Sequence, residues 1–297
     1  MNDSNRRLLP PMAMLQSFAA AARLGSFSRA AGELALTQGA VSRQVAALED
    51  WLGQTLFDRH GRRVTLNAAG RAYADAIAPA LGDIRRATRS VLTPGAARAL
   101  ELATLPGFGM RWLAPRLPRF SAAHPDVSVN LTAQNEDIDL GSSDFDAVIH
   151  FGAPDRVGGE HHLLFHEQVG PVLAPEFAAA VRCPADLLSV PLLTLRSRPD
   201  AWHDWFALAG ITDARVRVRA AHSQFLLLVQ EVAAGGGAAL IPGFLIESEL
   251  ATGALVQPFP IHLTSSHGYY LVHRPGPVCD ALARFRGWLQ QEINAPG

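Results

Sequence analysis

The chain has 297 residues, of which 48% are hydrophobic and 18% are charged, and its formal net charge is −1. This composition is typical of a globular protein with room for more than one domain. No apolar run approaches the ~18 residues of a membrane span, and the N-terminus lacks a signal-peptide core, so we expect a cytoplasmic protein without a membrane partner. Cys183 and Cys279 form no CxxC pair, which argues against a disulfide framework.

The charges are divided unevenly along the chain. All 26 basic residues are arginines, and residues 1–95 hold 12 of them against 7 acidic residues. Residues 96–297 hold 14 arginines against 20 acidic residues. A basic first third joined to an acidic remainder predicts that one part faces a polyanion while the other part has a different task.

Residues 1–95 have the pattern of several helices and one short hairpin. The first helix carries an apolar stripe that includes Leu15 and Phe18, and Gly25 is placed to end it. Ser26 or Ser28 is suited to cap the second helix. Thr37 is a candidate N-cap for the third helix, after a short turn that begins at residue 35.

The third helix shows one apolar face. On a helical wheel, the residues within roughly 40° of one another are Val41, Val45, Leu48 and Leu52. We expect this face to dock on the two preceding helices, through Leu34 and Leu36.

The opposite face of the same helix is small, hydrogen-bonding and cationic. Gly39, Ser42 and Arg43 lie roughly 100–200° from the apolar face, and Gln38 stands at the leading edge. Glutamine and arginine suit base edges in the major groove, while Thr37 and the helix N-terminus suit phosphate oxygens. The pattern predicts the recognition helix of a helix-turn-helix, although a plain three-helix module with a solvated face would share many of these features.

Two segments with strand chemistry follow, with Gly61 in the turn between them. Their arginines, Arg59, Arg62 and Arg63, suit a wing that lies along a DNA backbone. Asn67 is placed to cap a long helical pattern that ends near Pro94.

The stretch SFSRAAGELALTQGAVSRQVAALEDWLGQTLFDRHGRRVTLNAAG, residues 26–70, resembles the N-terminal signature of the LysR-type transcriptional regulators. MRWLAPRLPRF and SRPDAWHDWFALAGI are similar to the subgroup that includes regulators of glycine cleavage and of β-lactamase. The resemblance implies an all-α winged helix-turn-helix at 1–66, a linker and dimerisation helix at 67–95, and an effector-binding domain at 96–297. That domain would be an α/β two-lobed fold resembling type 2 periplasmic binding proteins.

The resemblance also implies the partners. They are double-stranded DNA, a small-molecule effector, a second or several further copies of the chain in a homodimer or homotetramer, and RNA polymerase. The DNA contacts carried over are Ser28, Thr37, Gln38, Gly39, Ser42, Arg43, Arg59, Arg62 and Arg63. No cofactor is expected.

The long helix departs from a simple dimerisation helix at Pro79, which lacks an N–H and predicts a kink. A near-heptad apolar stripe suited to a partner helix is formed by Tyr73, Ile77, Leu81, Ile84 and Val91. The alternative is that the stripe packs onto its own domain.

Strand and helix patterns alternate from residue 96 onward, which favours a layered α/β architecture. By resemblance, lobe one would comprise 96–167 and 272–297, and lobe two 168–271, with the effector between them. The candidate effector contacts are Gly107, Phe108, Gln134, His150, Thr194, Arg196, His222 and Ser223. Gly107 stands where the family often has a hydroxyl side chain, which puts a simple amino-acid or carboxylate effector in doubt.

Other chemistry finds little support in the sequence. The chain shows no GxSxG or Walker A pattern, so an enzyme with a DNA-binding appendage has no visible catalytic motif. His161, His162 and His166 fit no standard zinc spacing, and no metal site is expected. A constitutive DNA binder whose acidic part only assembles oligomers remains an alternative.

Overall fold

The computed structural model describes residues 8–60, 63–92, 98–134, 138, 140, 141, 143–153 and 158–295, with side chains left undescribed at some positions next to the gaps. By its internal contacts the chain divides into two compact units. Residues 1–95 with 139–144 form the first unit, and residues 96–138 with 145–297 form the second. Among the described residues, no helix is both long enough and apolar enough to span a bilayer.

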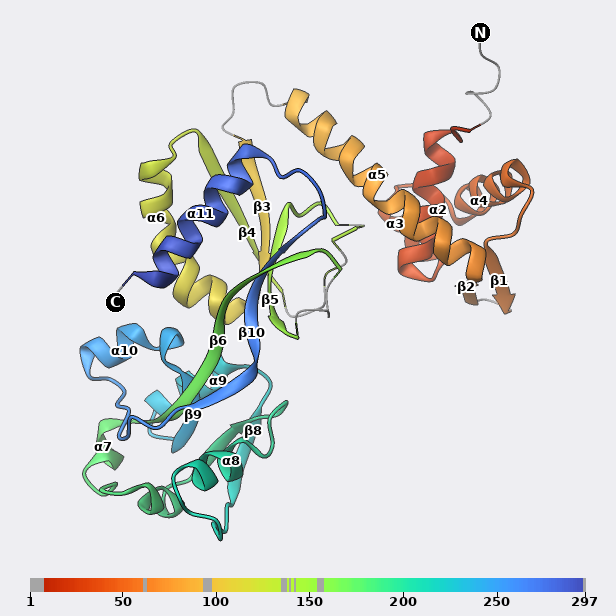
Figure 1. The fold of residues 1–297 in the computed structure, drawn as a ribbon. Helices are drawn as coiled ribbons and strands as arrows, with labels where there is room; N and C mark the ends of the chain where they lie inside the picture. The colour runs from red at the N-terminus through yellow and green to blue at the C-terminus, as the bar shows by residue number, and fades with distance from the viewer. Residues whose placement is uncertain are drawn as a thin grey trace. The chain divides into compact units, whose positions relative to one another are not determined.

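The first unit is built on three helices, a hairpin and one long helix (Figure 1). They are α2 (Met12–Leu24), α3 (Phe27–Glu33), α4 (Gln38–Leu52), β1 (Phe57–His60), β2 (Arg63–Leu66) and α5 (Ala68–Leu92). Gly25 ends α2 in the left-handed conformation with φ 60°, and Ser26 caps α3 by accepting a hydrogen bond from the Arg29 amide at 3.3 Å.

The core of this unit is formed by the apolar face predicted for α4. Val41, Val45 and Leu48 are fully buried, and they belong to the same cluster as Phe18 and Phe57. Leu34 packs against this cluster, but Leu36 is 47% exposed and does not dock the helix as expected. The reason is local: Ala35 adopts a left-handed φ of 52°, and this turn directs the chain away from the core before α4 begins.

The hairpin is held to both neighbouring helices. The Glu49 carboxylate of α4 accepts hydrogen bonds from the amides of Leu56 and Phe57, at 2.7 and 3.2 Å. Asn67 caps α5, because its side-chain oxygen accepts from the Gly70 amide at 2.8 Å while its side-chain nitrogen donates to the Thr55 carbonyl. Helix α5 continues through Pro79 without interruption.

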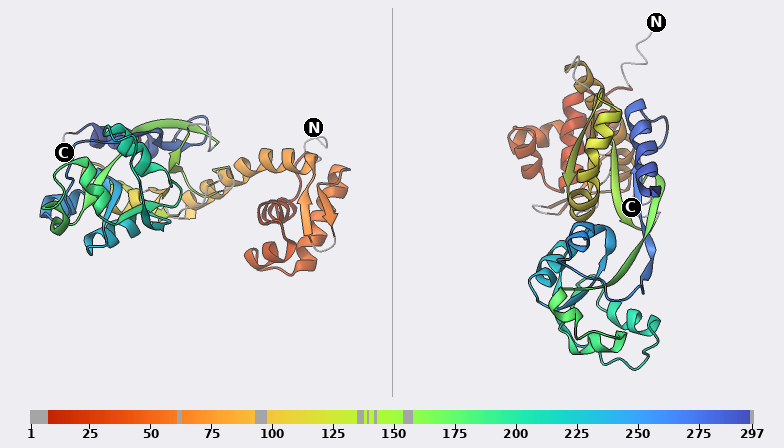
Figure 2. Two further views of the ribbon diagram at one scale, coloured as in Figure 1. Left: turned by 90° about the horizontal axis from the view of Figure 1, so that it is seen from below. Right: turned by 90° about the vertical axis from the view of Figure 1, so that its left-hand side faces the viewer.

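The second unit has one sheet that serves two lobes (Figures 1 and 2). The described strands are β3 (Arg98–Thr104), β4 (Val127–Ala133), β5 (Ala147–Gly152), β6 (Glu160–Leu173), β7 (Leu192–Leu195), β8 (Val218–His222), β9 (Ala238–Pro242) and β10 (Leu263–His273). Their order across the sheet is β4-β3-β5-β10-β6-β9-β7-β8. The long strands β6 and β10 run antiparallel side by side and connect the two halves.

Helices cover each half of the sheet. The described helical segments are η1 (Phe108–Leu113), α6 (Ala114–Ala123), α7 (Pro175–Ala178), η2 (Pro184–Ser189), α8 (Ala201–Leu208), α9 (Phe225–Ala233), η3 (Gly243–Leu245), α10 (Glu247–Thr252) and α11 (Asp280–Asn294).

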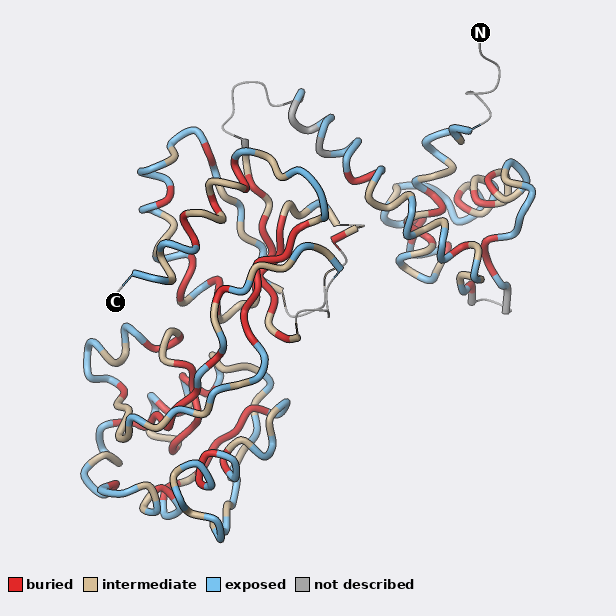
Figure 3. The backbone as a smooth tube through the Cα atoms, in the orientation of Figure 1, coloured by how far each residue is buried: buried red, intermediate tan, exposed pale blue. Residues whose placement is uncertain are grey.

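The second unit has separate cores in its two halves. Figure 3 shows buried backbone concentrated along the central strands. One core joins η1, α6 and α11 around β3 and β5, and it includes Phe120, Phe285 and Trp288. Two further cores lie around β7 and β9, one with Trp202 and Trp205 of α8 and one with Leu228 of α9. Because these cores lie at opposite ends of the two shared strands, the second unit has two lobes.

Candidate DNA-binding surface and effector cavity

The N-terminal end of α4 presents the predicted DNA-binding residues to solvent. Thr37 caps the helix by accepting from the Ala40 amide at 3.2 Å, and Gln38, Gly39 and Arg43 are exposed. Ser42 is half-buried. The surface therefore holds hydrogen-bond donors and acceptors on the side of α4 opposite its buried apolar face.

Gly39 and Arg43 are neighbours on this surface. A side chain added at Gly39 would place its Cβ 3.5 Å from an Arg43 guanidinium nitrogen, an ordinary contact distance. The guanidinium therefore lies over the first turn of α4. Ser28, on α3, is also exposed.

The wing residues are placed by their backbone alone. Arg59 lies on β1 opposite Val64, and Arg63 lies on β2 opposite His60. Arg62 lies outside the described residues. The strand pairing thus puts Arg59 and Arg63 on a hairpin that Glu49 ties to α4.

A cavity of about 710 Å³ lies between the two lobes of the second unit. Lobe one contributes Gly107, Phe108 and Phe151, while lobe two contributes Ser223 and Phe225, among others. A volume of this size accommodates a small organic molecule, and lining from both lobes is the usual setting of a ligand site.

Gly107, Phe108 and Ser223 are the predicted effector residues that line this cavity. Phe108 is 1% exposed, and its ring lies 5.0 Å from the ring of Trp112 and 5.5 Å from that of Tyr269, measured between centroids. Gly107 is the residue before η1 and already has helical backbone angles, with φ −59° and ψ −53°. A Cβ at Gly107 would lie 3.2 Å from Leu245 Cδ2.

The other five predicted effector residues do not line this cavity. Gln134 follows β4, where its amide donates to the Thr104 carbonyl. His150 neighbours the lining residue Phe151 on β5, and because side chains alternate along a strand it faces the opposite side of the sheet.

Thr194, Arg196 and His222 instead organise the loop after β7. The Thr194 hydroxyl donates to the Arg198 carbonyl at 3.0 Å, and the Arg196 amide donates to the His222 carbonyl at 2.6 Å. His222 also pairs through its ring Nε2 with the Glu231 carboxylate of α9. These contacts hold the segment that carries Arg198 into the cavity.

A buried polar group in the cavity was not predicted. Glu167 of β6 is 1% exposed, forms an ion pair with Arg198, and accepts a hydrogen bond from the Tyr269 hydroxyl at 3.1 Å. Burial raises the pKa of Tyr269 well above its usual value, and the nearby Glu167 carboxylate acts in the same direction. The Arg198 guanidinium lies 5.0 Å from the ring centre of Phe151 and 5.3 Å from that of Phe225.

The lobes also touch through ion pairs beside the cavity. Arg111 of η1 contacts Glu249 of α10 at 2.7 Å, and Arg116 of α6 contacts Glu247 at 2.8 Å. The Arg111 and Glu249 side chains are only 26% and 16% exposed, so this pair is partly shielded from water.

Comparison with known protein families covers nearly the whole chain. Residues 12–71 match the bacterial regulatory helix-turn-helix proteins of the lysR family, and residues 94–294 match the LysR substrate binding domain.

Two individual relatives match this chain over nearly their full length. The HTH-type transcriptional activator AmpR of Citrobacter koseri is 37% identical over 94% of this chain and 97% of its own length. The glycine cleavage system transcriptional activator of Escherichia coli K12 is 35% identical over 97% of this chain and 95% of its own.

Solved structures give the same picture. The effector domain of the regulator AmpR of Pseudomonas aeruginosa has a TM-score of 0.59 and 30% identity, covering 66% of this chain and 95% of that one. ArgP from Mycobacterium tuberculosis has a TM-score of 0.64 over 97% of this chain and 98% of that one; at 21% identity it shows the shared fold. The chain therefore belongs to the LysR family of transcriptional regulators, with an N-terminal helix-turn-helix domain that binds DNA and a C-terminal effector-binding domain.

Proposed function

We propose that this regulator reads its DNA site with the exposed face of α4 and answers to a small molecule held in the cavity between its lobes. Gln38, Ser42 and Arg43 contact base edges in the major groove. The phosphate contacts come from Thr37 and Ser28 and from the wing arginines, Arg59, Arg62 and Arg63, on either side of the groove. This assignment is supported by the start of α4, which is exposed and cationic on the side opposite the fully buried apolar face.

The cavity favours an effector that is neutral or carries a positive charge. Its lining includes three carboxylates, Glu167, Asp200 and Asp204, against one guanidinium, Arg198, which Glu167 already neutralises. A lone carboxylate ligand would therefore meet more negative than positive charge. The lining also offers aromatic rings and several hydroxyl groups: Phe108, Phe151, Phe225, Ser197, Ser223, Thr264, Ser265 and Ser266.

Effector binding at this site changes the contact between the lobes. The ligand touches residues of both lobes, and it therefore shifts the balance between more open and more closed arrangements. In a dimer or tetramer this shift alters how the bound DNA is bent, and with it the access of RNA polymerase. We place this activity in the cytoplasm, in homodimers paired into homotetramers.

A thermal-shift screen with small metabolites tests the effector site. A compound that binds only the folded chain raises its Tm, and we expect neutral and amine-bearing compounds among those that do. Ser223→Ala removes one hydroxyl from the cavity and should reduce the shift, since a hydrogen bond is worth about 0.5–1.5 kcal/mol. The control, Ser248→Ala, changes an exposed serine of α10 and should leave the shift unchanged.

Two results would count against this site. One is a stabilising compound whose effect is the same in Ser223→Ala and in variants that fill the cavity, such as Gly107→Leu. The other is a complete absence of stabilising compounds, which favours a constitutive DNA binder whose second unit only assembles oligomers.

A further inference from the structure

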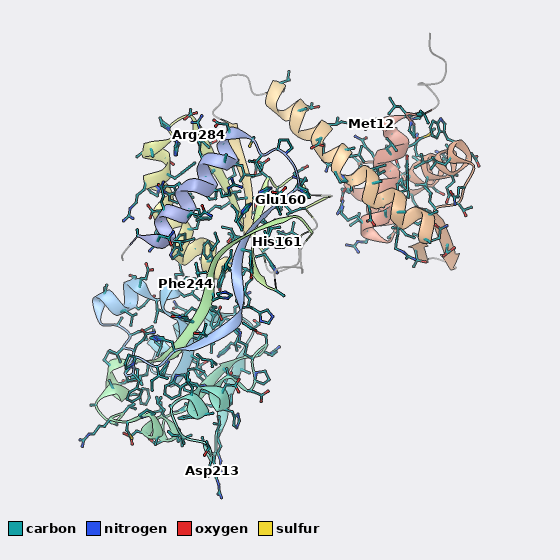
Figure 4. All side chains as sticks on the ribbon, in the orientation of Figure 1. Met12, Glu160, His161, Asp213, Phe244 and Arg284 are labelled. Carbon is teal, nitrogen blue, oxygen red and sulfur yellow. The ribbon has the colours of Figure 1, made fainter. Side chains whose placement is uncertain are left out.

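Three side chains outside both proposed sites converge on one face of the sheet. Glu160 and His162 lie two residues apart at the start of β6, so they point to the same side of the strand. His273, the last residue of β10, is paired in register with Glu160 and therefore lies on that same side. Figure 4 labels Glu160 at the beginning of β6, with His161 beside it.

The ligand atoms of these residues lie close together. The Nε2 atoms of His162 and His273 are 2.8 Å apart, and a Glu160 carboxylate oxygen lies 3.9 Å from the His273 Nε2. One donor atom from each of the three residues lies within 4.8 Å of the other two. Donors on a tetrahedral zinc ion are about 3.4 Å apart at bond lengths near 2.1 Å, so shifts of about 0.5–1.5 Å would bring all three into range.

The hydrogen bonds fix which nitrogen of His273 is available. His273 Nδ1 lies 2.7 Å from the Arg274 carbonyl, which can only accept, so Nδ1 carries a proton and, whenever the ring is neutral, Nε2 presents the lone pair. This is the second contact that a metal-binding histidine usually makes, because it holds the ring in one tautomer and orientation.

When the His273 ring is neutral, His162 lies between two groups that it cannot satisfy together. Its Nε2 is 2.8 Å from the His273 Nε2 and 3.2 Å from an Arg286 guanidinium nitrogen of α11, which can only donate. If Nε2 of His162 carries a proton it opposes Arg286, and if it carries a lone pair it opposes the lone pair of neutral His273. A cation between the two Nε2 atoms would accept both lone pairs at once, with the guanidinium displaced.

We propose that Glu160, His162 and His273 bind a divalent transition metal ion of the zinc type, with at least one coordination position open to water. Two imidazoles and one carboxylate are a donor set that zinc accepts. The Glu160 carboxylate is held by the Gly276 amide at 2.9 Å, and its side chain is 49% exposed, which gives the ion a path of entry. Bound there, the ion links β6 to β10 at the lobe-one end of the two strands that the lobes share.

Zinc titration of the full-length chain, monitored by competition with a chromophoric chelator and by Tm, tests the site. We expect one site in the wild-type chain that His162→Gln weakens by at least ~100-fold. The matched control is His166→Gln, which removes an exposed histidine of the same strand and should leave binding unchanged. DNA binding without metal, measured in parallel, confirms that each variant is folded.

Arg286→Gln provides an independent variant. It removes the donor that competes for the His162 lone pair, so zinc affinity should equal or exceed that of the wild-type chain. Cobalt in place of zinc should give visible ligand-field bands that His162→Gln abolishes. The proposal is overturned if wild-type and His162→Gln chains bind zinc equally, or if neither the wild-type chain nor Arg286→Gln binds zinc.

Discussion

At the scale of single residues, Gly70 lies where the long helix α5 packs against the segment leading into the hairpin. It lies in the first turn of α5, where its amide donates to Asn67. A Cβ at this position would lie 2.0 Å from the Leu56 carbonyl oxygen, a backbone atom that cannot swing aside. The glycine therefore allows α5 to approach the segment leading into β1 closely.

Gly70→Ala should destabilise the first unit by about 1–3 kcal/mol, because the added methyl group forces the backbones apart. Gly32→Ala is the matched control. Gly32 lies in α3 with nothing within 4 Å of the added Cβ, so alanine should stabilise the chain by about 0.5–1 kcal/mol. Urea unfolding of both variants measures the two changes, and equal effects would mean that the close approach at Gly70 has no energetic weight.

At the scale of elements, α5 serves two purposes along its length. Tyr73 and Ile77 pack against the core of the first unit. This is the alternative predicted from the sequence for the stripe, in which it packs onto its own domain and not onto a partner helix. Ile84 and Val91 follow the same stripe but are 48% and 74% exposed. The C-terminal half of the stripe is thus the part available to a second copy of the chain.

Ile84→Glu should weaken self-association at least about tenfold, since burying an isoleucine contributes about 1.5–3 kcal/mol and tenfold in Kd corresponds to about 1.4 kcal/mol. Ala72→Glu places the same charge off the apolar stripe, about 120° around α5 from Ile84 and at an exposed position, and should leave association unchanged. Sedimentation velocity across a concentration series compares them. Dimers of undiminished stability in Ile84→Glu would remove α5 from the interface.

Local patterns were sufficient to predict much of the first unit. The buried Val41, Val45 and Leu48, the N-cap at Thr37 and the cap at Asn67 all follow from short-range spacing, and all are present. The prediction that Leu36 docks α4 on the preceding helices was wrong, because the left-handed turn at Ala35 has no glycine to signal it.

The cavity was harder to predict because its residues meet only through the tertiary fold. Glu167 and Tyr269 lie on different strands 102 residues apart, and Arg198 reaches them from a loop. A buried glutamate inside a strand gives no periodic signal of its own. The same holds for His162 and His273, whose proximity depends on the pairing of β6 with β10.

At the scale of the whole molecule, the uneven distribution of charge along the chain follows the boundary between its DNA-binding and effector-binding domains. The basic first third holds the helix-turn-helix domain, and the acidic remainder holds the effector-binding domain, whose cavity is itself lined by three carboxylates and one guanidinium. Under the proposed function, the exposed face of α4 reads base sequence while the wing arginines supply affinity for any duplex.

Selection of preferred sequences from a random DNA pool, followed by affinity measurements over a salt series, tests that claim most directly. Arg43→Ala should cost about 1–3 kcal/mol on the selected site and relax the preference at the bases it contacts. Arg62→Ala should weaken selected and unselected DNA alike and lower the salt slope by about one. If Arg43→Ala instead selects the same sequence with undiminished affinity, α4 does not read DNA through this face and the account is contradicted.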